Sequence, residues 1–328
     1  MEQGGTEGSA ATATRAPRTP DAPRPPRWAR AHDGVPLGRS VARLALGDRH
    51  YDIGHRALVM GILNRTPDSF YDRGATYTLD ALVRRADELV AQGADVLDVG
   101  GVKAGPGPEV GEEEELDRVV PAVEAITARV DVPVSVDTWR AGVAAAAFDA
   151  GAVVGNDISG FADPDYLGVA ARAGASVVAT HIRLAPRVAD PDPPYADVVA
   201  TVAAFLVGRA ERAMAAGVPA DRVVLDAGLD LGKTADHSLS LLRASDVLAG
   251  LGFPVLLSAS NKTFLGVQLG LELHERREAS LAAAALGIAL GCRILRVHDV
   301  AGTVRVRDAL AAVLRQRAST PVPARQVR

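Results

Sequence analysis

The stretch VPVSVDTWRAGVAAAAFDAGAVVGND (132–157) contains the structural unit from which we predict the fold. Two short apolar runs, at 132–138 and 152–157, flank an Ala-rich segment, and each run carries Asp or Asn near its end. Short aliphatic runs bounded by turn residues are typical of strands that are buried on both faces. A strand, a helix and a second strand in this order predict two parallel strands joined by a right-handed crossover.

The same unit recurs along the chain on both sides of this stretch. The helical segments between the runs include 79–93, where Gly93 is a candidate for the helix end. The strand candidates are, in order, 57–64, 94–100, 132–138, 152–157, 175–181, 222–228, 254–260 and 293–299. Eight such units predict a single (β/α)8 TIM barrel. An open doubly wound sheet is the competing fold, but it places its site at one switch point rather than after nearly every strand.

Polar side chains stand at the end of each predicted strand. They are Asn64, Asp98, Asp137, Asn156, His181, Asp226, Ser260 and His298. Any one of them alone has an ordinary explanation, such as Asp137 capping a helix that begins near Trp139, or Asn156 and Asp157 closing a turn. Because the carboxyl ends of barrel strands share one rim, we expect these side chains to surround a polar, planar ligand that forms hydrogen bonds.

Basic residues follow the seventh and eighth predicted strands. Lys262, Arg296 and His298 stand where barrels frequently bind phosphate, and Lys and Arg side chains neutralise phosphate oxygens. The segment LDLGKT (229–234) lacks the first glycine of a phosphate-binding P-loop, so we predict no nucleotide site there.

Composition narrows the class of protein. The chain has 328 residues, of which 48% are hydrophobic and 23% charged, and its formal net charge of −4 is spread without a basic stripe, so we expect no nucleic-acid partner. Its single cysteine, Cys292, excludes a disulfide within the chain, and we expect it to be a buried apolar residue. No apolar run is long enough for a membrane span, and we expect a cytoplasmic protein without a membrane partner.

The two ends of the chain differ in composition from the middle. Residues 1–40 are rich in Ala, Pro, Thr, Gly and Arg and show no periodicity, which predicts a disordered tail. We assign 41–316 to the barrel and 317–328 to a C-terminal tail.

The stretch VMGILNRTPDSFYDRG (59–74) resembles the signature of the dihydropteroate synthases. Further matches follow in the same order, and the resemblance covers about residues 55 to 315. The matching segments are DVGG (98–101), SVDTWRA (135–141), NDISG (156–160), LDAGLDLGKT (225–234), SNKTFLG (260–266) and RVHDV (296–300).

The resemblance implies a transferase of folate biosynthesis that joins 6-hydroxymethyl-7,8-dihydropterin pyrophosphate to p-aminobenzoate and releases pyrophosphate. It also implies Mg²⁺ as cofactor and a homodimer. The implied pterin-binding residues are Asp137, Asn156, Asp226, Lys262 and Arg296, the last against the ring. The implied catalytic residues are Asn64, Asp72, Arg296 and His298, with Asn64 also at the metal, and Ser260 and Pro106 lie on the p-aminobenzoate side.

The chain departs from the family pattern mainly in its second loop. Where the family has D-x-G-G-E-S-T-R-P-G, the chain has DVGGVKAGPG (98–107), so Val102 to Gly105 replace Glu, Ser, Thr and Arg. The family's S-R-K is SNK (260–262), the aromatic residue of G-F-G-K is Leu231, and the methionine of the M-H pair is Thr180. Lys103 could supply the charge of the missing arginine but not its paired hydrogen bonds.

Three hypotheses follow. The first is a working synthase, and the second is a pterin-binding paralogue with weak or no synthase activity, because the p-aminobenzoate loop (Val102 to Gly107) has diverged. The third is a barrel of the methyltransferase type that handles methyltetrahydrofolate, which the long NRTPDSF match (64–70) disfavours.

Overall fold

The computed structural model describes, apart from Met1, residues 43–65, 78–105 and 107–313. The predicted tails (1–40 and 317–328), the first loop (66–74) with Asp72, and Pro106 therefore lie outside the described residues.

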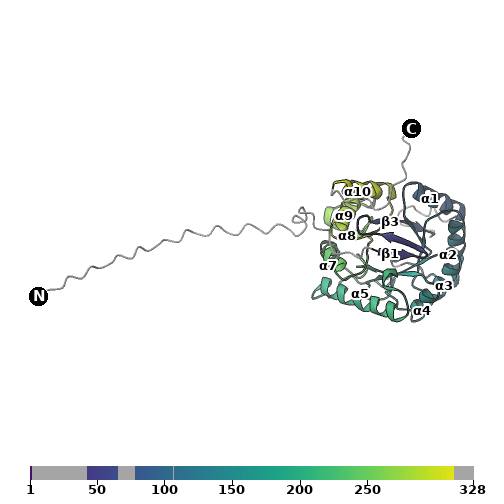
Figure 1. Ribbon diagram of the computed structural model, residues 1–328, viewed down its shortest axis with the longest axis horizontal. Coiled ribbons are helices and arrows are strands. Elements are labelled where there is room, and N and C mark those ends of the chain that lie inside the picture. The colour runs from purple at the N-terminus through teal and green to yellow at the C-terminus, as the bar shows by residue number, and fades with distance from the viewer. Residues whose placement is uncertain (2–42, 66–77, 106, 314–328) are drawn as a thin grey trace, which may run out of the picture. The chain divides into compact units, whose positions relative to one another are not determined.

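Eight parallel strands form a closed barrel in the order β10-β3-β4-β5-β6-β7-β8-β9, which confirms the predicted TIM barrel. Figure 1 shows the helices arranged around these strands. The strands are β3 (Leu58–Asn64), β4 (Val96–Gly100), β5 (Val134–Asp137), β6 (Val154–Asp157), β7 (Ser176–Thr180), β8 (Val223–Asp226), β9 (Val255–Leu257) and β10 (Ile294–Val297). Each lies inside one of the predicted apolar runs, because aliphatic residues on both faces suit strands covered by helices outside and packed together inside.

The covering helices carry apolar residues at helical spacing. In α1 (Leu79–Ala91) the buried residues are Leu82, Ala86 and Leu89, and Thr78 caps the first turn by accepting a hydrogen bond from Ala81 N. The others are α2 (Glu112–Thr127), α3 (Ala141–Asp149), α4 (Tyr166–Arg172), α5 (Val198–Ala215), α6 (Ala235–Arg243), α7 (Ser245–Ala249), α8 (Thr263–Leu269), α9 (Arg277–Ala289) and α10 (Val300–Val313), with short 3₁₀ helices η2 (Ala220–Arg222) and η3 (Leu273–Glu275). Among the helices described, none has both the length and the apolar character that crossing a membrane requires.

A hairpin that the sequence analysis did not predict precedes the barrel. Strands β1 (Arg43–Leu46) and β2 (Arg49–Asp52) pair antiparallel. Leu44, Leu46 and Ile53 belong to a buried cluster with residues from the first halves of the barrel strands: Leu58, Met60, Val96, Val154, Val178, Val224, Leu256 and Ile294. The hairpin thus packs against the amino-terminal end of the barrel interior, which leaves the carboxyl ends of the strands as the open end.

The single cysteine is buried as expected. Cys292 is 0% exposed and belongs to the main core between strands and helices. Burial raises the pKa of its thiol to about 11, so the group behaves as a small apolar side chain.

Candidate functional site

A cavity of about 120 Å³ lies at the carboxyl ends of the strands. Its lining consists of Ala104, Asp137, Asn156, Ile158, Thr180, Asp226, Leu229, Asp230, Leu231, Ser258, Lys262 and Arg296. The five residues expected to bind one ring are all among them, although they come from β5, β6, β8, β10 and the segment after β9. The parallel register explains part of this convergence, since Asp137 pairs with Asn156 and Thr180 with Asp226 at the strand ends.

Arg296 connects three strands across the inside of this site. Its Nε lies 2.6 Å from Asp98 Oδ2 and its Nη2 lies 2.6 Å from Asp137 Oδ2. Asp98 is fully buried and also accepts hydrogen bonds from Ser135 Oγ at 2.6 Å and Asn156 Nδ2 at 3.2 Å. A buried guanidinium needs such partners, and two carboxylates supply them for this arginine on a barrel strand.

The ordinary explanations of two rim residues can be tested directly. Asp137 caps no helix, because α3 begins at Ala141 rather than near Trp139, and Ala141 N donates to Asp163. Asp157, not Asn156, closes the turn after β6 by accepting from Ser159 N and Phe161 N. Neither Asp137 nor Asn156 is used to cap a helix or close this turn, and both line the cavity.

Burial governs the charges at the site. It raises the pKa of Asp137 to about 7, although Arg296 acts in the opposite direction. Burial also raises the pKa of Asp226 and lowers that of Lys262, while each of these two groups favours the charged form of the other. Lys262 Nζ donates to Leu229 O at 2.6 Å. The cavity thus offers carboxyl groups that can accept hydrogen bonds from N–H groups, and basic side chains that can bind a carbonyl oxygen or an anion.

A second, larger cavity of about 580 Å³ contains the other predicted residues of the last two strands. Ser260 Oγ and His298 Nδ1 are 3.0 Å apart, and His298 N donates to Ser260 Oγ at 3.2 Å. Arg85 and Arg277 also line this cavity, and Arg277 forms an ion pair with Asp299. The cations expected near an anionic group are therefore divided between two cavities, with Arg296 in the smaller one and His298 in the larger one.

Asn64, the last residue of β3, stands beside the smaller cavity. A Cβ added to Gly100 would lie 3.5 Å from Asn64 Oδ1 and 3.8 Å from Asp137 Oδ2, so both side chains flank this glycine. In residues 43–65, 78–105 and 107–313, no group of three or more His, Cys, Asp and Glu side chains could hold a metal ion. Any ion here would need oxygens from a ligand in addition to Asn64.

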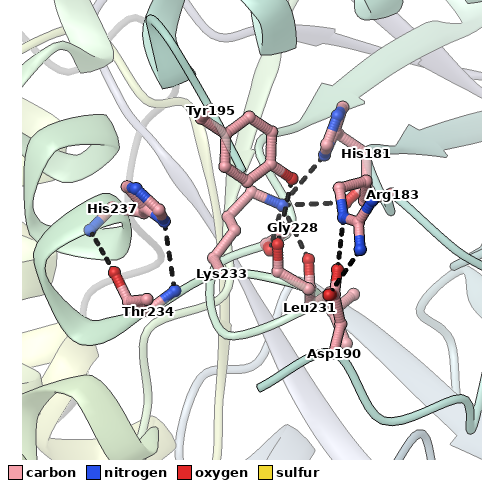
Figure 2. Close-up of polar contacts among 10 residues, drawn as sticks. His181, Arg183, Asp190, Tyr195, Gly228, Leu231, Lys233, Thr234 and His237 are labelled. Carbon is pink, nitrogen blue, oxygen red and sulfur yellow. Dashed lines mark hydrogen bonds and ion pairs between the residues drawn. The ribbon is translucent and has the colours of Figure 1, made fainter. Parts of the chain in front are cut away.

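Lys233 is a residue of the site region that the sequence analysis missed. It is only 7% exposed, and its Nζ lies 2.9 Å from His181 Nδ1, Gly228 O and Leu231 O (Figure 2). The ammonium group therefore holds together the loop that supplies Leu229, Asp230 and Leu231 to the cavity wall. Lys233 belongs to LDLGKT (229–234) and to the G-F-G-K match, and neither comparison assigned a role to the lysine.

The surroundings of Lys233 disfavour charge. Burial and the nearby Lys262 lower its pKa to about 7, and burial and Lys233 lower the pKa of His181 to about 3. The segment 182–197, between β7 and α5, contributes to this region. In Figure 2 its Tyr195 lies above Lys233, and the Tyr195 hydroxyl donates to Gly232 O at 2.9 Å.

Three positions where the chain departs from the synthase pattern line the smaller cavity. They are Ala104 in the second loop, Thr180 at the end of β7 and Leu231 in the Lys233 loop. Two other changed residues of the second loop differ in their environment, since Val102 is buried and Lys103 is exposed. The changes thus affect the wall of the cavity, while its carboxyl, amide and cationic groups are all present.

Comparison with known proteins gives a consistent set of relatives. A family model described as pterin binding enzyme matches residues 60–298. The chain is 48% identical over 279 residues to an inactive dihydropteroate synthase 2 of Mycobacterium leprae, covering 83% of this chain and 94% of that protein. It is 41% identical over 261 residues to the dihydropteroate synthase of Bacillus subtilis, covering 79% of this chain and 89% of that protein.

Solved structures agree with these relatives. The Yersinia pestis dihydropteroate synthase in complex with a sulfonamide drug superposes with a TM-score of 0.79 at 37% identity, covering 83% of this chain and 98% of that one. The Xanthomonas albilineans dihydropteroate synthase in complex with 7,8-dihydropteroate gives a TM-score of 0.74 at 39% identity, covering 85% of this chain and 100% of that one.

Proposed function

Because the chain belongs to the family of pterin-binding enzymes that includes the dihydropteroate synthases, we propose that its smaller cavity binds the ring of 6-hydroxymethyl-7,8-dihydropterin pyrophosphate. One observation carries the proposal: Asp137, Asn156, Asp226, Lys262 and Arg296 line a single cavity at the open end of the barrel. A flat amino-pyrimidinone ring has N–H donors for the two carboxyl groups and a carbonyl oxygen for the lysine. The proposal extends to the synthase reaction with p-aminobenzoate.

In that reaction the bond between the pterin methylene carbon and the diphosphate oxygen breaks. The p-aminobenzoate nitrogen forms the new bond to that carbon, loses a proton, and pyrophosphate leaves with the electron pair. Arg296 and His298 would stabilise the negative charge that grows on the leaving group. The buried carboxyl groups of Asp137 and Asp226 would hold the ring and favour the cationic carbon that develops beside it.

We propose that Mg²⁺ accompanies the diphosphate and that Asn64 supplies one of its oxygens. A single amide oxygen beside the cavity suits an ion that binds substrate phosphates and keeps several water molecules. The ion would neutralise charge on the diphosphate. Asp72 and Pro106, which lie outside the described residues, keep their proposed roles at the reacting centre and on the p-aminobenzoate side. We propose that Ser260 also contacts p-aminobenzoate.

We propose that the protein forms a homodimer, as the family resemblance implies, and that it acts in the cytoplasm, as expected from the sequence. Sedimentation equilibrium of the purified full chain tests the dimer: a mass of one chain at micromolar concentration would contradict it. Cell fractionation tests the location.

A second candidate function is pterin binding without useful synthase activity. Two observations favour it: a relative that is 48% identical bears the name inactive dihydropteroate synthase 2, and Ala104 of the altered second loop lies in the cavity wall. In this case the pterin side of the site would be intact and the amine side would be defective.

One experiment separates the two candidates. The purified full chain is incubated with the pterin pyrophosphate, Mg²⁺ and labelled p-aminobenzoate, and binding of 6-hydroxymethylpterin is measured by calorimetry in parallel. Labelled dihydropteroate at ordinary turnover supports the synthase, whereas pterin binding without product supports the binding protein.

A double variant, Ala104→Thr with Gly105→Arg, tests the second loop. If it gives no gain in p-aminobenzoate affinity, the second loop is not the cause of a defect.

The pocket itself is tested with two matched variants. Asp226→Asn should weaken 6-hydroxymethylpterin binding by about tenfold or more, because one of two buried acceptor oxygens for ring N–H groups becomes an N–H donor. Asp236→Asn, which changes an exposed carboxylate on α6, should bind like the unmodified chain. Equal affinities of all three proteins would refute the proposed pocket.

A further inference from the structure

Thr180 has a buried hydroxyl group that the site described so far does not use. The side chain is 1% exposed and lines the smaller cavity at the end of β7. Its Oγ1 is buried and has no hydrogen-bond partner among the described residues. Buried hydroxyl groups in folded proteins nearly always have a partner, so an exception next to a cavity calls for one from outside the chain.

The position of Thr180 indicates what this partner contacts. Strand β7 lies between β6, which ends with Asn156 and Asp157, and β8, which ends with Asp226. Thr180 and Asp226 are paired in the register of β7 and β8. The Thr180 hydroxyl therefore belongs to the same part of the cavity as the amide of Asn156 and the carboxyl group of Asp226.

The orientation of the side chain is constrained by the Gly228 loop. A Cβ added to Gly228 would lie 3.2 Å from Thr180 Cγ2, so the methyl group of Thr180 faces this loop. Gly228 approaches this strand closely, since the same Cβ would lie 2.0 Å from His181 O, and Lys233 holds the loop by donating to Gly228 O. The methyl group is therefore the branch of the Thr180 side chain that contacts this loop, and the hydroxyl is not.

We propose that Thr180 is a specificity-determining residue, whose hydroxyl forms a hydrogen bond with the exocyclic amino group of an amino-pyrimidinone ring. The inference rests on the proposed function in that it requires a ring of the pterin class in this cavity. An amino group has two hydrogens, and the carboxyl group of Asp226 and the Thr180 hydroxyl can each accept one. The methionine of the family pattern would offer only a weakly accepting thioether at this position.

The test uses two pairs of proteins that each differ by one hydroxyl group. The unmodified chain is compared with Thr180→Val, and Thr180→Ser with Thr180→Ala, so the shape of the side chain is nearly constant within each pair. Calorimetry measures the affinity for 6-hydroxymethylpterin, and urea unfolding measures the stability of the ligand-free protein. We expect the hydroxyl-free member of each pair to bind about tenfold more weakly. Its ligand-free stability should be equal or higher, because the hydroxyl has no partner to lose.

A ring analogue identifies the contacted group. The analogue has hydrogen in place of the exocyclic amino group, and with it the two members of each pair should bind equally. An equal loss with both rings would overturn the assignment to the amino group. Loss of ligand-free stability in Thr180→Val and Thr180→Ala would show a structural hydroxyl and overturn the proposal.

The outcome also separates this inference from the proposed function. If Asp226→Asn weakens binding and Thr180→Val does not, the pterin pocket stands and the role of Thr180 is refuted. If the unmodified chain does not bind 6-hydroxymethylpterin at millimolar concentration, both the pocket and the role of Thr180 are refuted.

Discussion

His181 gives the sharpest prediction about how the stability of this protein depends on pH. Its ring is 3% exposed, lies edge-on against Phe205 at 4.8 Å between ring centres, and forms a hydrogen bond with Lys233, with Nδ1 2.9 Å from Nζ. Burial and the adjacent ammonium group lower the pKa of His181 from 6.5 to about 3. The folded protein therefore keeps this ring neutral at pH values where the unfolded chain protonates it.

The size of the effect follows from the two pKa values. Above pH 6.5 the ring is neutral in both states, and its contribution to stability is fully present. As the pH falls from 6.5 towards 3, only the unfolded chain takes up the proton, which stabilises the unfolded state by about 1.4 kcal/mol per pH unit. Between pH 7 and pH 5 the protein should lose about 2 kcal/mol through this one residue.

The assay is urea unfolding of the unmodified chain and of His181→Asn at pH 8, 7, 6 and 5. Asparagine places its amide oxygen near the position of the imidazole Nδ1, so Lys233 keeps an acceptor while the titrating group is removed. Asp137 acts in the opposite direction: its pKa is raised to about 7, so its contribution to stability increases as the pH falls. Because Asp137 is present in both proteins, it cancels in their difference.

The reasoning predicts that the two stability curves diverge below pH 6.5. The unmodified chain should lose about 2 kcal/mol more than His181→Asn between pH 7 and pH 5. Parallel curves over this range would show that the ring is protonated in the folded protein, and the account of the His181–Lys233 pair would be refuted.

Three further predictions concern other buried groups. Arg296→Met should lower the free energy of unfolding at pH 8 by about 3–5 kcal/mol, because Asp98 and Asp137 lose their cation. A decrease in this free energy of less than about 1 kcal/mol in urea unfolding would contradict the prediction. Lys233→Met should destabilise the protein by about 2 kcal/mol or more, because three main-chain carbonyls lose their donor. It should also weaken 6-hydroxymethylpterin binding. Unchanged affinity in calorimetry would exclude a role of Lys233 in shaping the cavity. Cys292 should not react with iodoacetamide at pH 8 until urea unfolds the chain, because the thiol is buried and its pKa is raised. Mass spectrometry measures the labelling. Rapid labelling of the folded protein would contradict this prediction.

Local patterns in the sequence were sufficient to predict the barrel and most of the polar residues at its carboxyl-terminal rim. A strand buried on both faces leaves a short aliphatic run, and parallel strands alternating with helices bring all their carboxyl ends to one side. Asp137, Asn156 and Asp226 could therefore be assigned to one site from their places at the ends of three runs. The hairpin at 43–52 escaped prediction because two four-residue strands with mostly exposed polar residues in the second leave too weak a pattern.

Only the tertiary structure decided which side chains meet inside the barrel. Asp98 and Arg296 are 198 residues apart, and His181 and Lys233 are 52 apart, yet each pair is in direct contact. Nor does the sequence tell that the Thr180 hydroxyl lacks a partner, since that depends on the atoms around it in three dimensions. The order of residues determines the hydrophobic pattern and the ends of each strand. Contacts across the barrel form only when the barrel closes, because closure makes strands that are distant in the chain neighbours and buries their polar groups together.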